Sequence, residues 1–167
     1  SQRSAGARNR VFEKAVMAYK GSIDPNVERV ADLLRALMTA LVKGKTRLAL
    51  WILDEFDFSQ VAATQSATQI IGSASPFPKS GSQLAGTGYL ISVEPNSVDE
   101  LVEVLTGEDH LDCCIMHLEI EMEGNIAVAA YDHFSCLFFN EPIGQVFLED
   151  LKQQTIINDY SLPKAEE

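Results

Sequence analysis

The sequence predicts an α+β fold, in which an N-terminal helical part packs on a mostly antiparallel sheet with two covering helices. Three observations support this class: helical spacing of apolar residues in residues 8–42, strand-like alternation in residues 114–121, and a capped helical segment between two strand-like segments. With 167 residues and 46% hydrophobic content, the chain can bury one core. We therefore expect a single domain over residues 1–167.

Two amphipathic helices are expected before residue 44. Apolar residues three and four positions apart predict the first over residues 8–20, with Gly21 as its stop. Asp24-Pro25 is a start signal for the second, because Asp caps free amides and Pro fits the first turn. The next run, Thr46–Phe56, fits a buried strand or a return helix. The sharp link at Gly44 and the good helix formers favour the helix.

A polar segment separates two parts of the domain. Ser, Thr, Gln, Ala and Gly dominate residues 59–87, where we expect a short helix over residues 60–71 and then a loop. A loop of this length is usually functional or a linker. We therefore divide the chain into a mainly helical basic part over residues 1–71, a loop over residues 72–87 and an acidic α+β part over residues 88–162.

The acidic part begins with a strand and a helix. Tyr89–Val93 has the composition of a strand. Ser97 and Glu100 have the spacing of a capping box, which predicts a helix over residues 97–106 that ends near Gly107. Period-two alternation over residues 114–121 then predicts a strand with one face exposed to water.

A hairpin, a strand and a final helix complete the predicted order. Met122-Glu123-Gly124 is expected to form a three-residue turn, in which Gly takes the left-handed position. Pairing Glu121 with Asn125 then sets Leu118 opposite Val128. A strand over residues 134–139, a helix over residues 142–154 and a short segment at residues 156–157 follow. The inner stripe of that helix is expected to hold Ile143, Val146, Phe147 and Leu151, with Leu148 at its edge.

The net charge of −11 hides a division along the chain. Residues 1–50 carry ten Lys and Arg against four Asp and Glu, a net charge of +6, whereas residues 51–167 carry three against twenty, a net charge of −17. So acidic a part repels phosphate backbones, which argues against nucleic-acid binding.

No apolar run reaches membrane-spanning length, and three clustered cysteines suit reduced thiols. We expect a soluble, cytoplasmic protein without a membrane partner.

The carboxylates after residue 93 form the candidate partner-binding surface. They come from consecutive elements, which usually pack as neighbours, so they are expected to present one negative face. Such a face steers a basic protein partner to fast association. This favours a non-enzymatic protein-interaction module, of which an immunity- or antitoxin-like inhibitor is one form. The candidate residues are Glu94, Asp99, Glu100, Glu103, Asp109, Asp112, Glu119, Glu121 and Glu123.

Two alternatives stay open. The first is a metal-binding protein or hydrolase that uses side chains on the 113–133 hairpin, whose residue types bind zinc or transfer protons. These positions lack the compact ligand spacing of zinc sites, so we expect neither metal nor cofactor and lean against an enzyme. The second is a structural or assembly subunit that forms a homo-oligomer through its N-terminal helices. The metal candidates are His117, Glu119, Asp132, His133 and Cys113.

Overall fold

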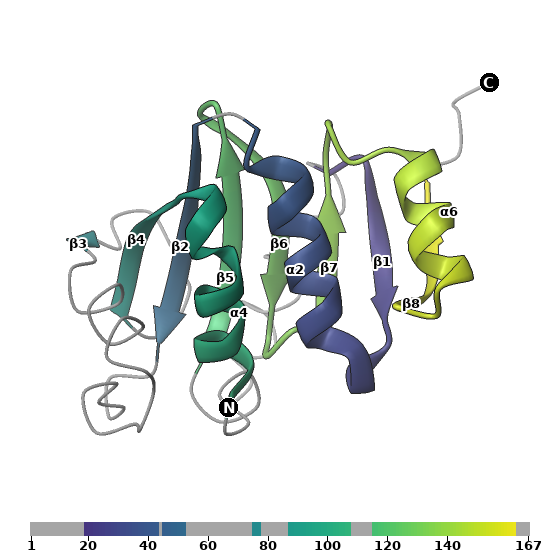
Figure 1. Ribbon diagram of the computed structural model, residues 1–167, viewed down its shortest axis with the longest axis horizontal. Coiled ribbons are helices and arrows are strands. Elements are labelled where there is room, and N and C mark those ends of the chain that lie inside the picture. The colour runs from purple at the N-terminus through teal and green to yellow at the C-terminus, as the bar shows by residue number, and fades with distance from the viewer. Residues whose placement is uncertain (1–18, 44, 53–74, 78–86, 108–114, 163–167) are drawn as a thin grey trace, which may run out of the picture.

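The computed structural model describes residues 19–43, 45–52, 75–77, 87–107 and 115–162. Within these ranges the chain forms one antiparallel sheet of eight strands, and helices pack against one of its faces (Figure 1). This arrangement confirms the predicted α+β class. Of the helix predicted over residues 8–20, the structure describes only residues 19 and 20, which are not helical, and the helix predicted over residues 60–71 lies outside the described residues.

The strands run in the order β3-β4-β2-β5-β6-β7-β1-β8 across the sheet. Their bounds are Gly21–Pro25 for β1, Thr46–Ile52 for β2, Ser75–Phe77 for β3, Thr87–Val93 for β4, Ile115–Met122 for β5, Asn125–Tyr131 for β6, Cys136–Phe139 for β7 and Ile157–Ser161 for β8. The helices are α2 (Val30–Leu41), α4 (Val98–Thr106) and α6 (Gln145–Gln153), with the 3-10 turns η1 (Val27–Arg29) and η3 (Pro95–Ser97). Strands from both halves of the sequence therefore share one sheet.

The core lies between this sheet and its helices. In β5, Leu118 and Ile120 point toward the helices and are fully buried. Helices α2 and α4 contact each other and close the core over the middle of the sheet, while α6 packs against β8 (Figure 1). Each buried side chain of this size stabilises the fold by roughly 1.5–3 kcal/mol. The buried helix residues are Leu33, Leu34, Leu37, Met38 and Leu41 of α2 and Val98, Leu101, Val102, Val104 and Leu105 of α4.

The prediction of a helix over residues 46–56 is wrong for its first seven residues, which form strand β2. This strand pairs with β4 on one side and β5 on the other. Leu48 and Leu50 face the helices, and Ala49 and Trp51 are buried on the opposite side. A strand that is covered on both faces has no polar alternation, so its sequence resembles that of a buried helix.

The segment before α2 is also a strand, so the described residues of the N-terminal part are not mainly helical. Strand β1 lies between β7 and β8. Gly21, predicted as a helix stop, is the first residue of β1, where a Cβ atom would collide with the Phe139 ring and the Ser161 carbonyl oxygen. The N-cap is Asn26, two residues after the predicted Asp24. Its side chain accepts a hydrogen bond from the Glu28 N–H (3.2 Å), and η1 begins at the next residue.

Two predictions around β4 need correction. The loop predicted over residues 72–87 contains strand β3 and the first residue of β4. The predicted capping box at Ser97 and Glu100 does not form. Instead, the Ser97 hydroxyl accepts a hydrogen bond from the Glu94 N–H (3.1 Å) and donates one to the Glu94 carbonyl oxygen (2.9 Å). The box therefore belongs to η3, and α4 begins one residue after Ser97.

The β5–β6 hairpin has a two-residue turn, so the predicted three-residue turn and its register are wrong. Met122 pairs with Asn125, and the turn residues Glu123 and Gly124 have φ angles of 51° and 83°. Two positive φ angles allow a type I′ turn, whose twist matches that of the strands. A bulge then shifts the register, so that Leu118 lies opposite Ala130. The bulge keeps apolar residues on the helix side of both strands.

The C-terminal elements follow the prediction, with a different inner stripe on the helix. Helix α6 spans the middle of the predicted range 142–154. Leu148, predicted at its edge, is fully buried together with Leu151, whereas Val146 is 88% exposed. The short segment predicted at residues 156–157 is the start of β8.

Candidate functional site

Polar and aromatic side chains gather on the sheet face that is turned away from the helices. Because side chains alternate along β5, His117 and Glu119 point to this face. The strand register places Trp51 beside His117. The structure thus brings together two of the predicted site residues, and it adds aromatic neighbours that the prediction did not include.

A chain of hydrogen bonds joins Glu119 to two tyrosines. The Tyr131 hydroxyl donates to Oε1 of Glu119 (3.1 Å), and it lies 3.1 Å from the Tyr19 hydroxyl. Since Tyr131 gives its one proton to Glu119, Tyr19 donates to Tyr131. Burial raises the pKa of the Glu119 carboxyl, and the hydrogen bond from Tyr131 partly offsets this. We call these three residues the tyrosine–glutamate chain.

His117 is held as a neutral ring next to this chain. Its Nδ1 accepts a hydrogen bond from the backbone N–H of Asp132 (3.1 Å), so the ring proton is on Nε2. The ring makes edge contacts with Trp51 (6.5 Å between centroids) and Tyr131 (5.7 Å). Burial lowers the pKa of His117 to about 4, although Asp132 acts in the opposite direction.

The turn between β6 and β7 positions Asp132 for this contact. Asp132, His133 and Phe134 all have left-handed backbones, with φ angles of 52°, 56° and 70°. The His133 N–H donates to the Met116 carbonyl oxygen (2.9 Å), which fixes the turn against β5. Asp132 therefore meets His117 through its backbone, while its own side chain is exposed.

The predicted metal candidates do not form a metal site within the described ranges. No group of three or more His, Cys, Asp or Glu there is arranged to hold an ion. His117 and Glu119 share one face, but Asp132 and His133 belong to the turn. Cys113 lies outside the described residues. The arrangement suits holding a proton among Glu119, Tyr131 and Tyr19 better than ligating a cation.

The candidate acidic residues are divided between the two sides of the sheet. One group lies on the helix side, on α4 and just before η3. Glu119 and Glu121 lie on the opposite side, and Glu123 is in the hairpin turn. Asp109 and Asp112 lie outside the described residues. The helix-side group, which we call the α4 acidic surface, consists of Glu94, Asp99, Glu100 and Glu103.

Several of these carboxylates contact cations or amides of the same chain. Arg47 forms an ion pair with Glu121, with Nε 3.1 Å from Oε1. The Lys45 N–H donates to Glu123 (2.7 Å).

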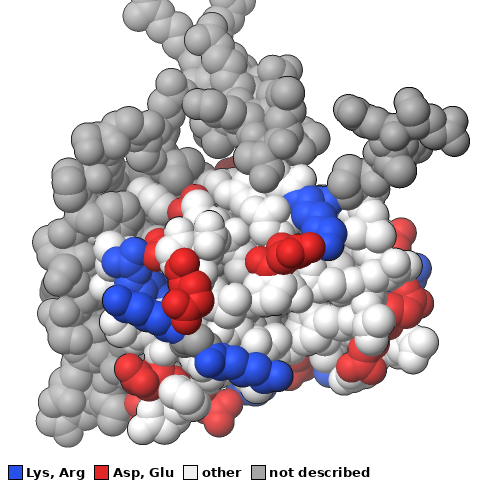
Figure 2. Space-filling view, turned by 90° about the horizontal axis from the view of Figure 1, so that it is seen from above, with Lys and Arg blue, Asp and Glu red and all other residues white. Residues whose placement is uncertain are grey.

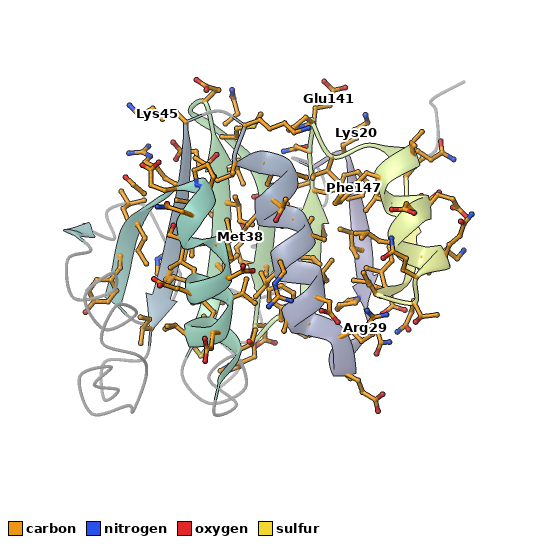
Figure 3. The ribbon with its side chains drawn as sticks, in the orientation of Figure 1. Lys20, Arg29, Met38, Lys45, Glu141 and Phe147 are labelled. Carbon is orange, nitrogen blue, oxygen red and sulfur yellow. The ribbon has the colours of Figure 1, made fainter. Side chains whose placement is uncertain are left out.

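At the upper edge of the sheet, acidic and basic side chains alternate and do not form one negative field (Figure 2). Figure 3 shows Lys20 and Glu141 at this edge, where their charged groups lie 3.3 Å apart.

A groove of about 560 Å³ opens beside the tyrosine–glutamate chain. It runs along β1 between β7 and β8, and Tyr19 and Phe138 contribute to its wall. The rings of Tyr19 and Phe138 are stacked, with their centroids 5.5 Å apart. The sequence prediction missed this groove because it treated residues 21–25 as a link between helices. Only their pairing in a sheet creates the hollow.

No protein-family model, curated protein or solved structure matches the chain. Over the residues that the structure describes, no helix has the length and apolar character needed to cross a membrane. A function must therefore follow from the residues described above.

Proposed function

We propose that this protein is a non-enzymatic interaction module that binds a basic protein partner through the α4 acidic surface. The observation that carries the proposal is the charge balance around α4. Four carboxylates come from one turn and helix, and among the residues that the structure describes the cation paired with them is Arg35, which lies 3.0 Å from Asp99. Arg35 also pairs with Asp32 (3.3 Å), so its charge is shared.

The position of each carboxylate along α4 shows whether its charge stabilises the helix or needs another explanation. Asp99 and Glu100 lie in the first turn of α4, where negative charge favours the helix by opposing its dipole. Glu103 lies in the C-terminal half, where the same dipole disfavours a carboxylate. Glu94 is exposed and caps η3, where its side chain accepts a hydrogen bond from the Ser97 N–H. Glu103 is therefore the carboxylate of this surface whose charge is best explained by a partner.

The balance of charge over the wider molecule supports the same proposal. Asp and Glu outnumber Lys and Arg by fifteen to seven over the described residues. A negative surface of this kind accelerates association with a basic protein and weakens as salt screens it. His117 and Glu119, on the opposite face of the sheet, favour a binding role over a catalytic one. His117 Nδ1 and Glu119 Oε1 each already accept a hydrogen bond from within the chain, so neither atom is open to take a proton from a substrate.

The test compares two charge-neutralising variants with equal changes in net charge. One is Glu94→Gln/Glu103→Gln, and the matched control is Glu149→Gln/Asp150→Asn on the exposed side of α6. Each protein is cross-linked in an extract of the source organism at about 0.05 M and about 0.5 M salt, where screening differs strongly. Captured proteins are then identified by mass spectrometry.

We expect the wild type and the α6 control to capture the same basic protein at low salt, and the α4 variant to lose it. High salt should release it from the wild type and from the α6 control. Capture that is insensitive to salt, or that both variants lose equally, would reject the α4 surface as the docking site.

A further inference from the structure

The groove along β1 has an apolar wall and a polar floor. The Tyr19 ring forms the wall, with the buried Phe138 ring stacked behind it, and the register places Ser22 between Phe138 and Ser161. Serine side chains are short, so the hollow lies above them. Their hydroxyls accept hydrogen bonds from any donor that enters. The groove is thus suited to a ligand with an apolar body and a hydrogen-bond donor.

The charges along the groove favour a cation. Three charged residues line it, namely Lys20, Asp24 and Asp159. Lys20 is paired with Glu141 (3.3 Å), and Asp159 with Lys152 (3.1 Å). The Asp24 carboxylate has no ion-pair or hydrogen-bond partner among the residues that the structure describes. Asp24 lies opposite Asp159 across β1 and β8, and because Lys152 already pairs with Asp159, Asp24 is the groove carboxylate best placed to receive a cation.

The spacing within the groove sets the size of that cation. Ser22 pairs with Phe138, and Asp24 lies two residues further along β1, which is roughly 7 Å. This span fits one ammonium group attached to a single ring or a short alkyl body. The groove volume of about 560 Å³ is also within the range of small-molecule sites.

We infer that the groove between β7, β1 and β8 binds a small organic cation, with its ammonium group at Asp24 and its apolar body against the Tyr19 ring. The site lies on the sheet face opposite α4, so it does not depend on the proposed partner surface. Either idea can fail while the other holds.

The test uses benzylamine as the probe, with benzyl alcohol as the neutral molecule of the same shape. Binding is measured by NMR titration of the labelled full chain. Position is measured by the rate of thiol modification at Cys136, which lines the groove, with peptide mapping to separate it from Cys113 and Cys114. The variants are Asp24→Asn, which removes the charge, and Ser22→Leu, which fills the hollow. Asp150→Asn is the control of equal charge change.

We expect benzylamine to bind more tightly than benzyl alcohol and to slow the modification of Cys136. Asp24→Asn should weaken benzylamine binding by about three- to fivefold, the effect of one exposed charge pair. Ser22→Leu should abolish the protection of Cys136, and Asp150→Asn should change neither readout. The unfolding midpoint of each variant confirms that it remains folded.

Several results would overturn the inference. Equal binding of benzylamine and benzyl alcohol would remove the role of charge, and an unchanged affinity in Asp24→Asn would remove the role of that carboxylate. Unprotected Cys136 would place the probe elsewhere. Binding of an arginine-containing peptide without binding of benzylamine would assign the groove to a protein segment and reject a small cation.

Discussion

Acidification is expected to destabilise the fold through His117. The pKa of His117 is about 4 in the folded chain against 6.5 for an unperturbed histidine. As the pH falls, the unfolded chain therefore takes up the proton first, so the contribution of neutral His117 is complete above 6.5 and is lost toward 4. The difference between these two pKa values limits the loss of unfolding free energy from this residue to about 3 kcal/mol. Because the ring is partly exposed, solvent screening lowers the expected loss to about 1–2 kcal/mol.

A second effect acts in the same direction. The Nδ1 atom of His117 accepts a hydrogen bond from the Asp132 N–H. Protonation of that atom removes the acceptor, so the left-handed turn at residues 132–134 loses one of its hydrogen bonds to β5, while the bond from the His133 N–H to the Met116 carbonyl oxygen remains. The acid-induced loss should therefore include increased exchange of the Asp132 amide, which hydrogen-exchange NMR measures directly.

The assay is urea unfolding of the wild type and of His117→Gln at about pH 7 and about pH 4.5, a window that spans most of this titration. Glu119 has the opposite sign, because its raised pKa favours the protonated form in the fold as the pH falls. Its contribution is present in both proteins and cancels in the comparison. The wild type should lose about 1–2 kcal/mol more than the variant over this window. Equal losses in the two proteins would show that His117 is not held neutral by the fold.

Three further predictions concern the packing of the sheet. Gly21→Ala should lower the unfolding free energy by about 1–3 kcal/mol, because the new methyl group meets the Ser161 carbonyl oxygen and the Phe139 ring; an unchanged thermal midpoint would contradict the close approach of β8 and β7 to β1 at this residue. Tyr131→Phe removes the donor to Glu119 and should cost about 1–3 kcal/mol by urea unfolding; a neutral result would mean that the tyrosine–glutamate chain contributes nothing to stability. Leu118→Ala should cost about 2–5 kcal/mol in the same assay, since the side chain is fully buried beneath the helices; a loss below about 1 kcal/mol would place it outside the core.

Local periodicity was enough to predict the elements that are polar on one side. Helix α4 and strand β5 each bury an apolar face and carry polar residues on the other, so their spacing identified them. Strand β2 is buried on both faces, and its partners lie far along the sequence. Strand β1 is short and carries a glycine and a proline, which are typical of turns. In both strands the tertiary pairing decided the structure, and local preference did not.

The candidate site was predictable only within one hairpin. Alternation along β5 was enough to place His117 and Glu119 on one face. Their partner Tyr19 is 112 residues away from Tyr131 in the sequence, and no local signal links the two. The positions of the acidic residues could not be predicted either. Helix α4 and strand β5 follow each other in the sequence, but the acidic side chains of β5 point to the sheet face opposite α4. Charge composition predicted how many carboxylates there are, and the topology decided where they point.

The insertion of β1 between β7 and β8 orders the events of folding. A nascent chain that ends before residue 136 has no partner for β1 on either side, so the backbone amides and carbonyls of residues 21–25 must remain hydrated or find other contacts. Completion of the sheet requires closure of a loop of more than one hundred residues, a slow step in polypeptide folding. The last strands to be synthesised thus decide when the first one becomes native.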